Sequence, residues 1–271
     1  MNFISSILLG ILQGLTEFLP VSSSGHLVLA QHFFGLEDTG DVLFEVFLHL
    51  GTLLAVLVFF RRRIGELVVS LFSWRGTVSN QAHRHNRNLL LYLAVATLVT
   101  GVVFVLLGDL FESLFAKPLI VACMLLVTGI IVYTSDLMKG GATPASEMGL
   151  VRSCAIGLIQ GVAIIPGISR SGSTIAGALY TGVKRQEAAE FSFLLSIPAI
   201  LAANLANFGE FKALGASQLG IYLAGFVAAF VAGYLVISFL IKLIVRARLK
   251  YFAYYCWAVG LVSIVFILLG R

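Results

Sequence analysis

Two polar segments interrupt otherwise apolar sequence, and their side chains suit phosphate chemistry. The first runs from Gln13 and Glu17 through Pro20 to three consecutive serines, 22–24, and then His26. Gln13 and Glu17 are four residues apart, so on a helix they share one face. A carboxylate, three hydroxyls and an imidazole can supply a nucleophile together with acid–base groups. An alternative is that these groups only join helices by hydrogen bonds, a common role of buried polar side chains.

The second polar segment centres on Arg170, in a turn predicted at 167–172. The guanidinium stays charged and offers a planar fork for phosphate oxygens. Turn amides, hydroxyls and the N-terminus of a helix expected to begin near Thr174 add further donors to an anion. An alternative is that Arg170 merely pairs with Glu17, which would still place both residues at one cavity. The flanking hydroxyl side chains are Ser169, Ser171, Ser173 and Thr174.

These groups together predict phosphoryl transfer to water, in which positioning and charge neutralisation supply most of the catalysis. Arg170 and its neighbours would clamp the phosphate, and Ser22 would add a hydroxyl from the first segment. Glu17 would hold a metal ion or orient the nucleophile. One of the three serines would attack phosphorus or position a water, a choice that the sequence leaves open, and the histidine would relay the proton.

A divalent cation, Mg²⁺ or Ca²⁺, is the cofactor expected at such a site. Glu17, with Gln13 as a second ligand, would hold it while it bridges phosphate oxygens. Gln13 and Glu17 carry one formal charge between them, so the substrate would have to supply further ligands.

Other polar residues favour less specific roles. Glu45 and His49 form an i, i+4 pair early in a predicted span, and Glu190 is the counterpart of Glu45. Carboxylates near helix starts favour the helix dipole, so structural roles are preferred here. His83 and His85 are expected in a solvated cytoplasmic loop and not in a metal site.

The composition excludes a water-soluble fold. The chain of 271 residues is 59% hydrophobic and 11% charged, against roughly 25% charged residues in soluble domains. Several charge-free stretches reach the ~18–20 residues that cross about 30 Å of hydrocarbon as a helix. The net charge of +5 does not indicate a nucleic-acid partner, because the basic residues lie between these stretches.

The polar segments are predicted to be helix–loop–helix hairpins that enter the membrane and return to the same side. Each has about 17 apolar residues, a break rich in proline, glycine and serine, and a short apolar run to Phe34 or Tyr180. Irregular backbone at membrane depth requires protein or a water-filled cavity around it. Six full spans are then expected at about 42–60, 89–108, 118–136, 190–208, 217–243 and 251–270.

The two hairpins repeat each other in opposite orientations. Gly10–Gly14 and Gly157–Gly161 share the pattern Gly-x-x-Gln-Gly at an offset of 147 residues. Three spans per half is an odd number, so an inverted repeat is predicted. With the first hairpin entering from outside, fourteen basic residues face the cytoplasm and three face outward, as the positive-inside rule requires. The fourteen are Arg61, Arg62, Arg63, Arg75, Arg84, Arg87, Lys139, Arg152, Lys184, Arg185, Lys242, Arg246, Arg248 and Lys250, and the three are Lys117, Lys212 and Arg271.

The predicted fold is therefore an all-α polytopic membrane protein with an inverted-topology repeat, six transmembrane helices and two re-entrant hairpins. Residues 1–271 would form a single membrane domain made of two inverted repeats, about 1–136 and 150–271. The oligomeric state is open, with a homodimer as the form considered.

The motifs Gln13–His26 and Pro166–Thr174 closely resemble the two signature motifs of the undecaprenyl-diphosphatase, or bacitracin-resistance protein, family. The resemblance covers essentially the whole chain. It implies a multi-pass enzyme of the bacterial inner membrane, with its site open to the periplasmic side, that removes one phosphate from undecaprenyl diphosphate. That reaction would recycle the lipid carrier for peptidoglycan synthesis and confer bacitracin resistance.

The resemblance also implies residue roles and a divalent cation. The family has Glu or Gln at the first position of the first motif and Glu at the fifth, which are Gln13 and Glu17 here. Its serine and histidine map onto Ser23 and His26, and its phosphate-binding arginine and threonine map onto Arg170 and Thr174.

Two other classes of function fit parts of this pattern. Inverted repeats with broken helices are a transporter design, so a transporter or flippase of a polyprenyl phosphate lipid is the main alternative. The pair of Ser23 and His26 beside Glu17 favours hydrolysis, because transport needs no nucleophile. A purely structural membrane scaffold leaves the buried arginine unexplained.

Overall fold

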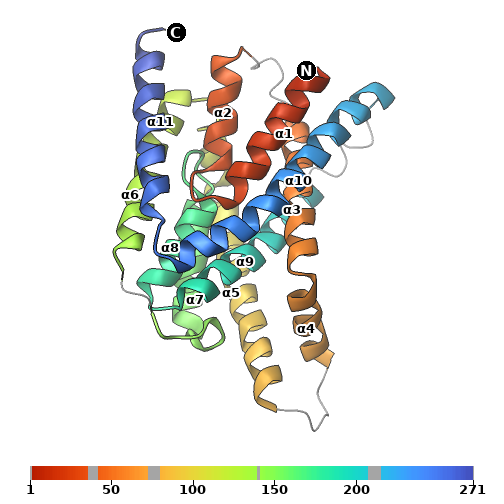
Figure 1. The fold of residues 1–271 in the computed structure, drawn as a ribbon, viewed down its shortest axis with the longest axis vertical. Coiled ribbons are helices and arrows are strands. Elements are labelled where there is room, and N and C mark those ends of the chain that lie inside the picture. The colour runs from red at the N-terminus through yellow and green to blue at the C-terminus, as the bar shows by residue number, and fades with distance from the viewer. Residues whose placement is uncertain (1, 36–41, 73–79, 139–140, 207–214, 271) are drawn as a thin grey trace.

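The computed structural model describes residues 2–35, 42–72, 80–138, 141–206 and 215–270. Arg75, Lys139, Lys212 and Arg271, which entered the charge comparison, lie outside the described residues. Within those ranges the chain is helical and has no β-strand, apart from one isolated bridge between Thr143 and Val183 (Figure 1). The helices are α1 (Phe3–Phe18), α2 (Ser23–Phe33), α3 (Val42–Phe59), α4 (Arg61–Phe72), α5 (Asn80–Glu112), α6 (Pro118–Asp136), the short 3₁₀ helix η2 (Ala145–Glu147), α7 (Gly149–Val162), α8 (Arg170–Tyr180), α9 (Arg185–Ala206), α10 (Ala216–Val245) and α11 (Lys250–Leu268).

Five of the described helices are long and apolar enough to cross a membrane, namely α5, α6, α9, α10 and α11. The pair α3 and α4 counts as a sixth if both form one span, bent by 74° at the break between them. The helices that cover the six predicted spans are therefore present, and the all-α polytopic class is confirmed.

Both polar segments form a helix, a break and a second helix. The second helices, α2 and α8, have 11 residues each, which is about 16 Å and half of a hydrocarbon core. α1 packs on α2, and α7 packs on α8. The start of α1 and the end of α2 lie at the same end of the molecule in Figure 1, as the hairpin prediction requires.

Two sequence predictions about helix boundaries are wrong. His83 and His85 lie in the first turns of α5, not in a loop, because α5 begins at Asn80. The segment from Asn80 to Leu93 contains no glycine or proline, so its high charge does not interrupt the helix. Likewise α8 begins at Arg170, four residues before the predicted start near Thr174.

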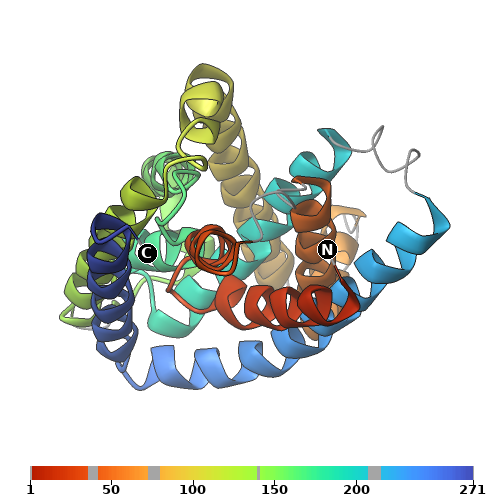
Figure 2. The same ribbon diagram turned by 90° about the horizontal axis from the view of Figure 1, so that it is seen from above.

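Helices from the first half of the chain pack against helices from the second half. α1 lies along α10, α7 packs against α5, and α6 packs against α11 (Figures 1 and 2). Glycines allow this close approach: a Cβ on Gly14 would lie 2.5 Å from the carbonyl oxygen of Ala229, and one on Gly157 would lie 2.5 Å from that of Ala96. Small residues at helix crossings are the usual means of packing in membranes. The repeat boundaries at about 136 and 150 stay a prediction, and this reciprocal packing is consistent with it.

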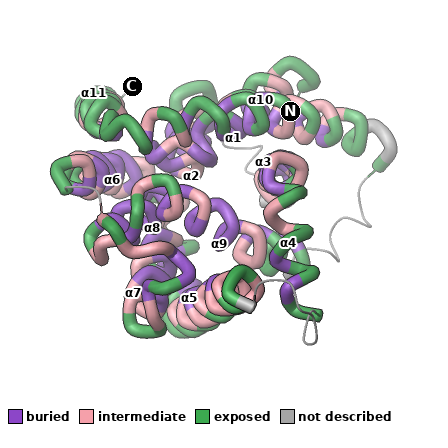
Figure 3. Tube along the Cα trace, turned by 60° about the horizontal axis from the view of Figure 1, so that its bottom comes forward, coloured by how far each residue is buried: buried purple, intermediate pink, exposed green. Residues whose placement is uncertain are grey.

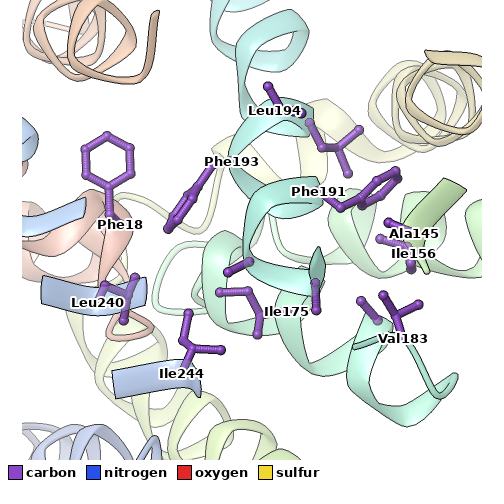
Figure 4. Close-up of a cluster of buried hydrophobic side chains, with 14 of the residues drawn as sticks. Phe18, Ala145, Ile156, Ile175, Val183, Phe191, Phe193, Leu194, Leu240 and Ile244 are labelled. Carbon is purple, nitrogen blue, oxygen red and sulfur yellow. The ribbon is translucent and has the colours of Figure 1, made fainter. Parts of the chain in front are cut away.

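The core lies around α8 and α9, whereas the outer helices carry apolar side chains on their surfaces. In Figure 3 the central helices α8 and α9 are largely buried. Figure 4 shows Phe18 and Phe193 facing each other, with ring centroids 5.7 Å apart at 85°. Outward-facing residues such as Val105 and Val151 are 83% and 84% exposed. Apolar surface on this scale indicates contact with lipid.

Candidate active site

The breaks of the two hairpins meet inside the protein. A Cβ on Gly25 would lie 3.0 Å from Cα of Gly167, and one on Gly172 would lie 3.1 Å from Cβ of Pro20. The hydroxyl of Ser171 donates a hydrogen bond to the carbonyl oxygen of Leu19 at 3.1 Å. Segments from the first and the second half of the chain therefore meet at one place.

Glu17 and Arg170 form an ion pair at this junction. Nη2 of Arg170 donates to Oε1 of Glu17 at 2.5 Å, and the two side chains are 19% and 4% exposed. The pairing that the sequence offered as an alternative is thus present. It does not use the whole guanidinium, since Nη1 of Arg170 is buried without a hydrogen-bond partner. A buried cationic donor without a partner suits an anionic ligand.

The other carboxylate oxygen of Glu17 joins three more side chains. Oε2 accepts hydrogen bonds from Oγ of Ser23 at 2.6 Å and from Nε2 of Gln13 at 2.9 Å. Nε2 of His49 lies 3.6 Å from the same oxygen. The spacing of Gln13 and Glu17 predicted their contact. His49, for which a structural role was preferred, lies beside the site, and no local spacing connects it with Glu17.

His26 is held by two contacts that do not include Ser23. Its Nδ1 lies 2.7 Å from the carbonyl oxygen of Ser22, and its Nε2 lies 2.9 Å from the hydroxyl oxygen of Tyr255. Ser22 caps α2, accepts from the backbone N–H of Gly25 at 3.2 Å, and has φ +70° and ψ 97°. A serine with positive φ is strained, and such strain occurs often at functional sites. Tyr255 was not predicted, because it comes from the last helix.

The second hairpin places Arg170 at the first position of α8, where backbone N–H groups favour anions. Ser169 caps this helix and accepts from the N–H of Gly172 at 3.0 Å. Its own N–H donates to Oγ1 of Thr128 at 2.9 Å. Thr174 donates to the carbonyl oxygen of Arg170 at 2.8 Å. These hydrogen bonds fix the conformation of the chain at the start of α8. The predicted phosphate contacts of Ser169 and Thr174 would have to form in addition to them.

The remaining hydroxyls predicted to bind phosphate also lie at this tip. Ser171 and Ser173 are buried in the first turn of α8. Oγ of Ser171 lies 3.2 Å from Oγ of Ser169. These hydroxyls therefore belong to residues next to Arg170 in the chain, and their contact with phosphate stays a prediction.

The residues around Glu17 suit a cation that prefers oxygen ligands. Among the described residues no group of three or more His, Cys, Asp or Glu side chains could hold a metal ion. Oε1 of Gln13, however, is a buried amide oxygen without a hydrogen-bond partner. Mg²⁺ and Ca²⁺ bind carboxylate and amide oxygens together with phosphate. Gln13 and Glu17 are thus compatible with such an ion if a phosphate supplies further oxygens.

Comparison with known proteins identifies the family of the chain. Residues 6–262 match the family described as bacitracin resistance protein BacA. A protein of Methanobrevibacter smithii named undecaprenyl-diphosphatase is 44% identical over 97% of this chain and 96% of its own length. Proteins with the same name from Desulforapulum autotrophicum and Carboxydothermus hydrogenoformans are 41% and 37% identical, over 98% and 100% of both chains. A match over nearly the whole length shows that this chain belongs to the bacitracin resistance protein BacA family.

Proposed function

We propose that this chain is an integral membrane phosphatase that hydrolyses undecaprenyl diphosphate to undecaprenyl phosphate and inorganic phosphate. The observation that carries this proposal is the contact of Arg170, Glu17 and Ser23 at the junction of the two hairpins. A cation with a free donor, a carboxylate and a hydroxyl are the groups that phosphoryl transfer needs. The name undecaprenyl-diphosphatase, which the relatives carry, supplies the substrate.

In the proposed mechanism, Arg170 binds the terminal phosphate through Nη1 and the N–H groups at the start of α8. Ser23 donates its hydrogen bond to Glu17, so the carboxylate can orient this hydroxyl or take its proton. Attack on the terminal phosphorus forms a new P–O bond and breaks the bond to the bridging oxygen, and undecaprenyl phosphate leaves. If Ser23 is the nucleophile, water then hydrolyses the phosphoserine. If water attacks directly, Ser23 positions it.

His26 is proposed as the group that relays a proton. Ser23 and His26 are three residues apart on α2, so both side chains lie on one side of that helix. Gln13 and Glu17 would hold the divalent cation, which would neutralise phosphate charge when bound. Both roles rest on the kind and position of the side chains.

The proposed setting is the bacterial inner membrane, with the site open to the periplasmic side. Support comes from the basic residues, which gather between spans on one side under the predicted topology. The products would then be released where the carrier is recycled for peptidoglycan synthesis. Removal of undecaprenyl diphosphate would also account for bacitracin resistance.

Release of inorganic phosphate tests the proposal. Purified protein in detergent should release phosphate from a polyprenyl diphosphate, and a chelator should abolish the release. Glu17→Ala should lower turnover about 10²–10⁴-fold, the range of a general acid–base group. Glu66→Ala, which removes a carboxylate paired with Arg63 at an exposed position, is the control for loss of charge, and elution of Glu17→Ala as folded protein is the control for breaking the buried pair. Absence of release from the wild type, together with transfer of labelled lipid between leaflets of a liposome, would support the flippase alternative instead.

A further inference from the structure

Tyr255, in the last helix of the chain, makes two contacts with one histidine of the first hairpin. Its hydroxyl oxygen lies 2.9 Å from Nε2 of His26. The two rings are also stacked, with centroids 5.4 Å apart and planes 5° apart. A hydrogen bond and a stack on the same partner fix both the position and the plane of the imidazole.

The partners of His26 determine which ring nitrogen carries hydrogen. The carbonyl oxygen of Ser22, 2.7 Å from Nδ1, can only accept, so Nδ1 must be the donor. The same carbonyl accepts from the backbone N–H of His26 at 3.2 Å. In the neutral imidazole Nε2 then carries the lone pair, and the hydroxyl of Tyr255 donates to it.

We infer that Tyr255 is a positioning residue that holds the imidazole of His26 in one orientation by donating to Nε2, while the carbonyl oxygen of Ser22 fixes the tautomer. The inference rests on the proposed phosphatase function for its kinetic consequence. The strained backbone at Ser22 fixes one edge of the imidazole, and the phenol fixes the opposite edge. The second half of the chain thereby contributes to the acid–base group of the first hairpin, in addition to supplying Arg170.

Packing alone would explain the stack but not the hydrogen bond, and one substitution separates the two. Tyr255→Phe keeps the aromatic ring against His26 and removes only the donor. Tyr254→Phe is the matched control, because the adjacent tyrosine packs with Tyr133 and Trp257, at centroid distances of 6.1 Å and 5.9 Å. If Tyr255 acted only by packing, Tyr255→Phe and Tyr254→Phe would have the same effect.

The experiment combines kinetics with nitrogen NMR of histidine-labelled protein in detergent. Tyr255→Phe should lower kcat for phosphate release about fivefold with KM unchanged, the effect of one lost hydrogen bond. In the His26→Ala background the same substitution should have no further effect. The Nε2 resonance of His26, assigned by its loss in His26→Ala, should shift in Tyr255→Phe and stay in place in Tyr254→Phe.

Unchanged kcat together with an unmoved Nε2 resonance in Tyr255→Phe would overturn the inference. Equal losses in Tyr255→Phe and Tyr254→Phe would overturn it as well. The NMR shift does not depend on turnover. An inactive wild type would therefore count against the proposed function, while the shift would still decide whether Tyr255 holds His26.

Discussion

Replacing Arg170 with lysine tests the part of the site that is proposed to bind phosphate. Arg170 uses Nη2 to hold Glu17 and leaves Nη1 buried without a partner. Lysine keeps a positive charge opposite the carboxylate, so Glu17 is not left as an unpaired buried charge. An unpaired buried charge would lower the free energy of unfolding by about 3–5 kcal/mol, and loss of activity could then result from loss of folding. What lysine removes is the second arm of the fork.

The expected loss of kcat in Arg170→Lys follows from that missing donor. One ammonium nitrogen can stay with Glu17 or move to the phosphate, whereas the guanidinium reaches both through different nitrogens. Loss of one preorganised donor to a transition-state oxyanion costs about 3–4 kcal/mol. Arg170→Lys should therefore lower kcat about 10²–10³-fold.

The assay is phosphate release from a polyprenyl diphosphate in detergent, with Arg63→Lys as the control. Arg63 also pairs with a glutamate of another helix, since its Nε donates to Glu190 at 2.6 Å. It lies in α4, and its other side-chain hydrogen bonds among the described residues go to Glu66 and Asn86. Both variants should elute as folded protein, and only Arg170→Lys should lose turnover. A kcat within about threefold of the wild type would refute the clamp, and so would an equal loss in Arg63→Lys.

Two further predictions concern the nucleophile and the helix packing. If Ser23 attacks phosphorus, rapid quenching of a reaction with phosphate-labelled substrate should trap phosphoserine at Ser23. Ser23→Ala should then lose both the trapped label and turnover, whereas Ser24→Ala should keep both. Turnover without any trapped label would assign the attack to water. Gly14→Ala should lower the free energy of unfolding by about 1–3 kcal/mol, because the added Cβ would lie 2.5 Å from the carbonyl oxygen of Ala229. Gly101→Ala, whose Cβ would meet nothing within 4 Å, should not lower thermal stability in the same detergent.

The breaks in the two hairpins were predictable from local chemistry. Proline cannot donate a backbone hydrogen bond, so Pro20 and Pro166 mark where α1 and α7 can no longer continue. The start of α8 was placed too late because the glycines around Arg170 resembled a turn. Ser169 accepts from the N–H of Gly172, three residues later, and that capping pattern was the signal to use.

The helix boundaries between residues 61 and 88, where basic residues are frequent, were harder to predict, because charge indicates exposure and not the absence of a helix. α4 begins at Arg61 and α5 at Asn80, so the residues assigned to one loop are mostly helical. The bend of 74° between α3 and α4 has no proline at its break. Nothing in the local sequence predicts its angle.

Within the site, sequence reasoning found the residues that the hairpins carry and missed those that other helices supply. The inverted repeat predicted that Glu17 and Arg170 meet, although they are far apart in the chain. His49 and Tyr255 come from α3 and α11, and their contacts depend on how those helices pack. A single sequence holds no signal of that packing.

The two hairpins share the order helix, break and helix but differ in their polar side chains, which bears on the choice between hydrolysis and transport. Gln160 is the counterpart of Gln13, yet it donates to Thr100 of α5 at 3.0 Å. At the offset of 147 residues that relates the two glutamines, isoleucine 164 stands where the first half has Glu17. Equivalent polar groups in both repeats would be evidence for a transporter, in which two inverted repeats exchange conformations. Here the carboxylate, serine and histidine all belong to the first hairpin and the guanidinium belongs to the second. That division suits one fixed reaction site, because each tip supplies what the other lacks.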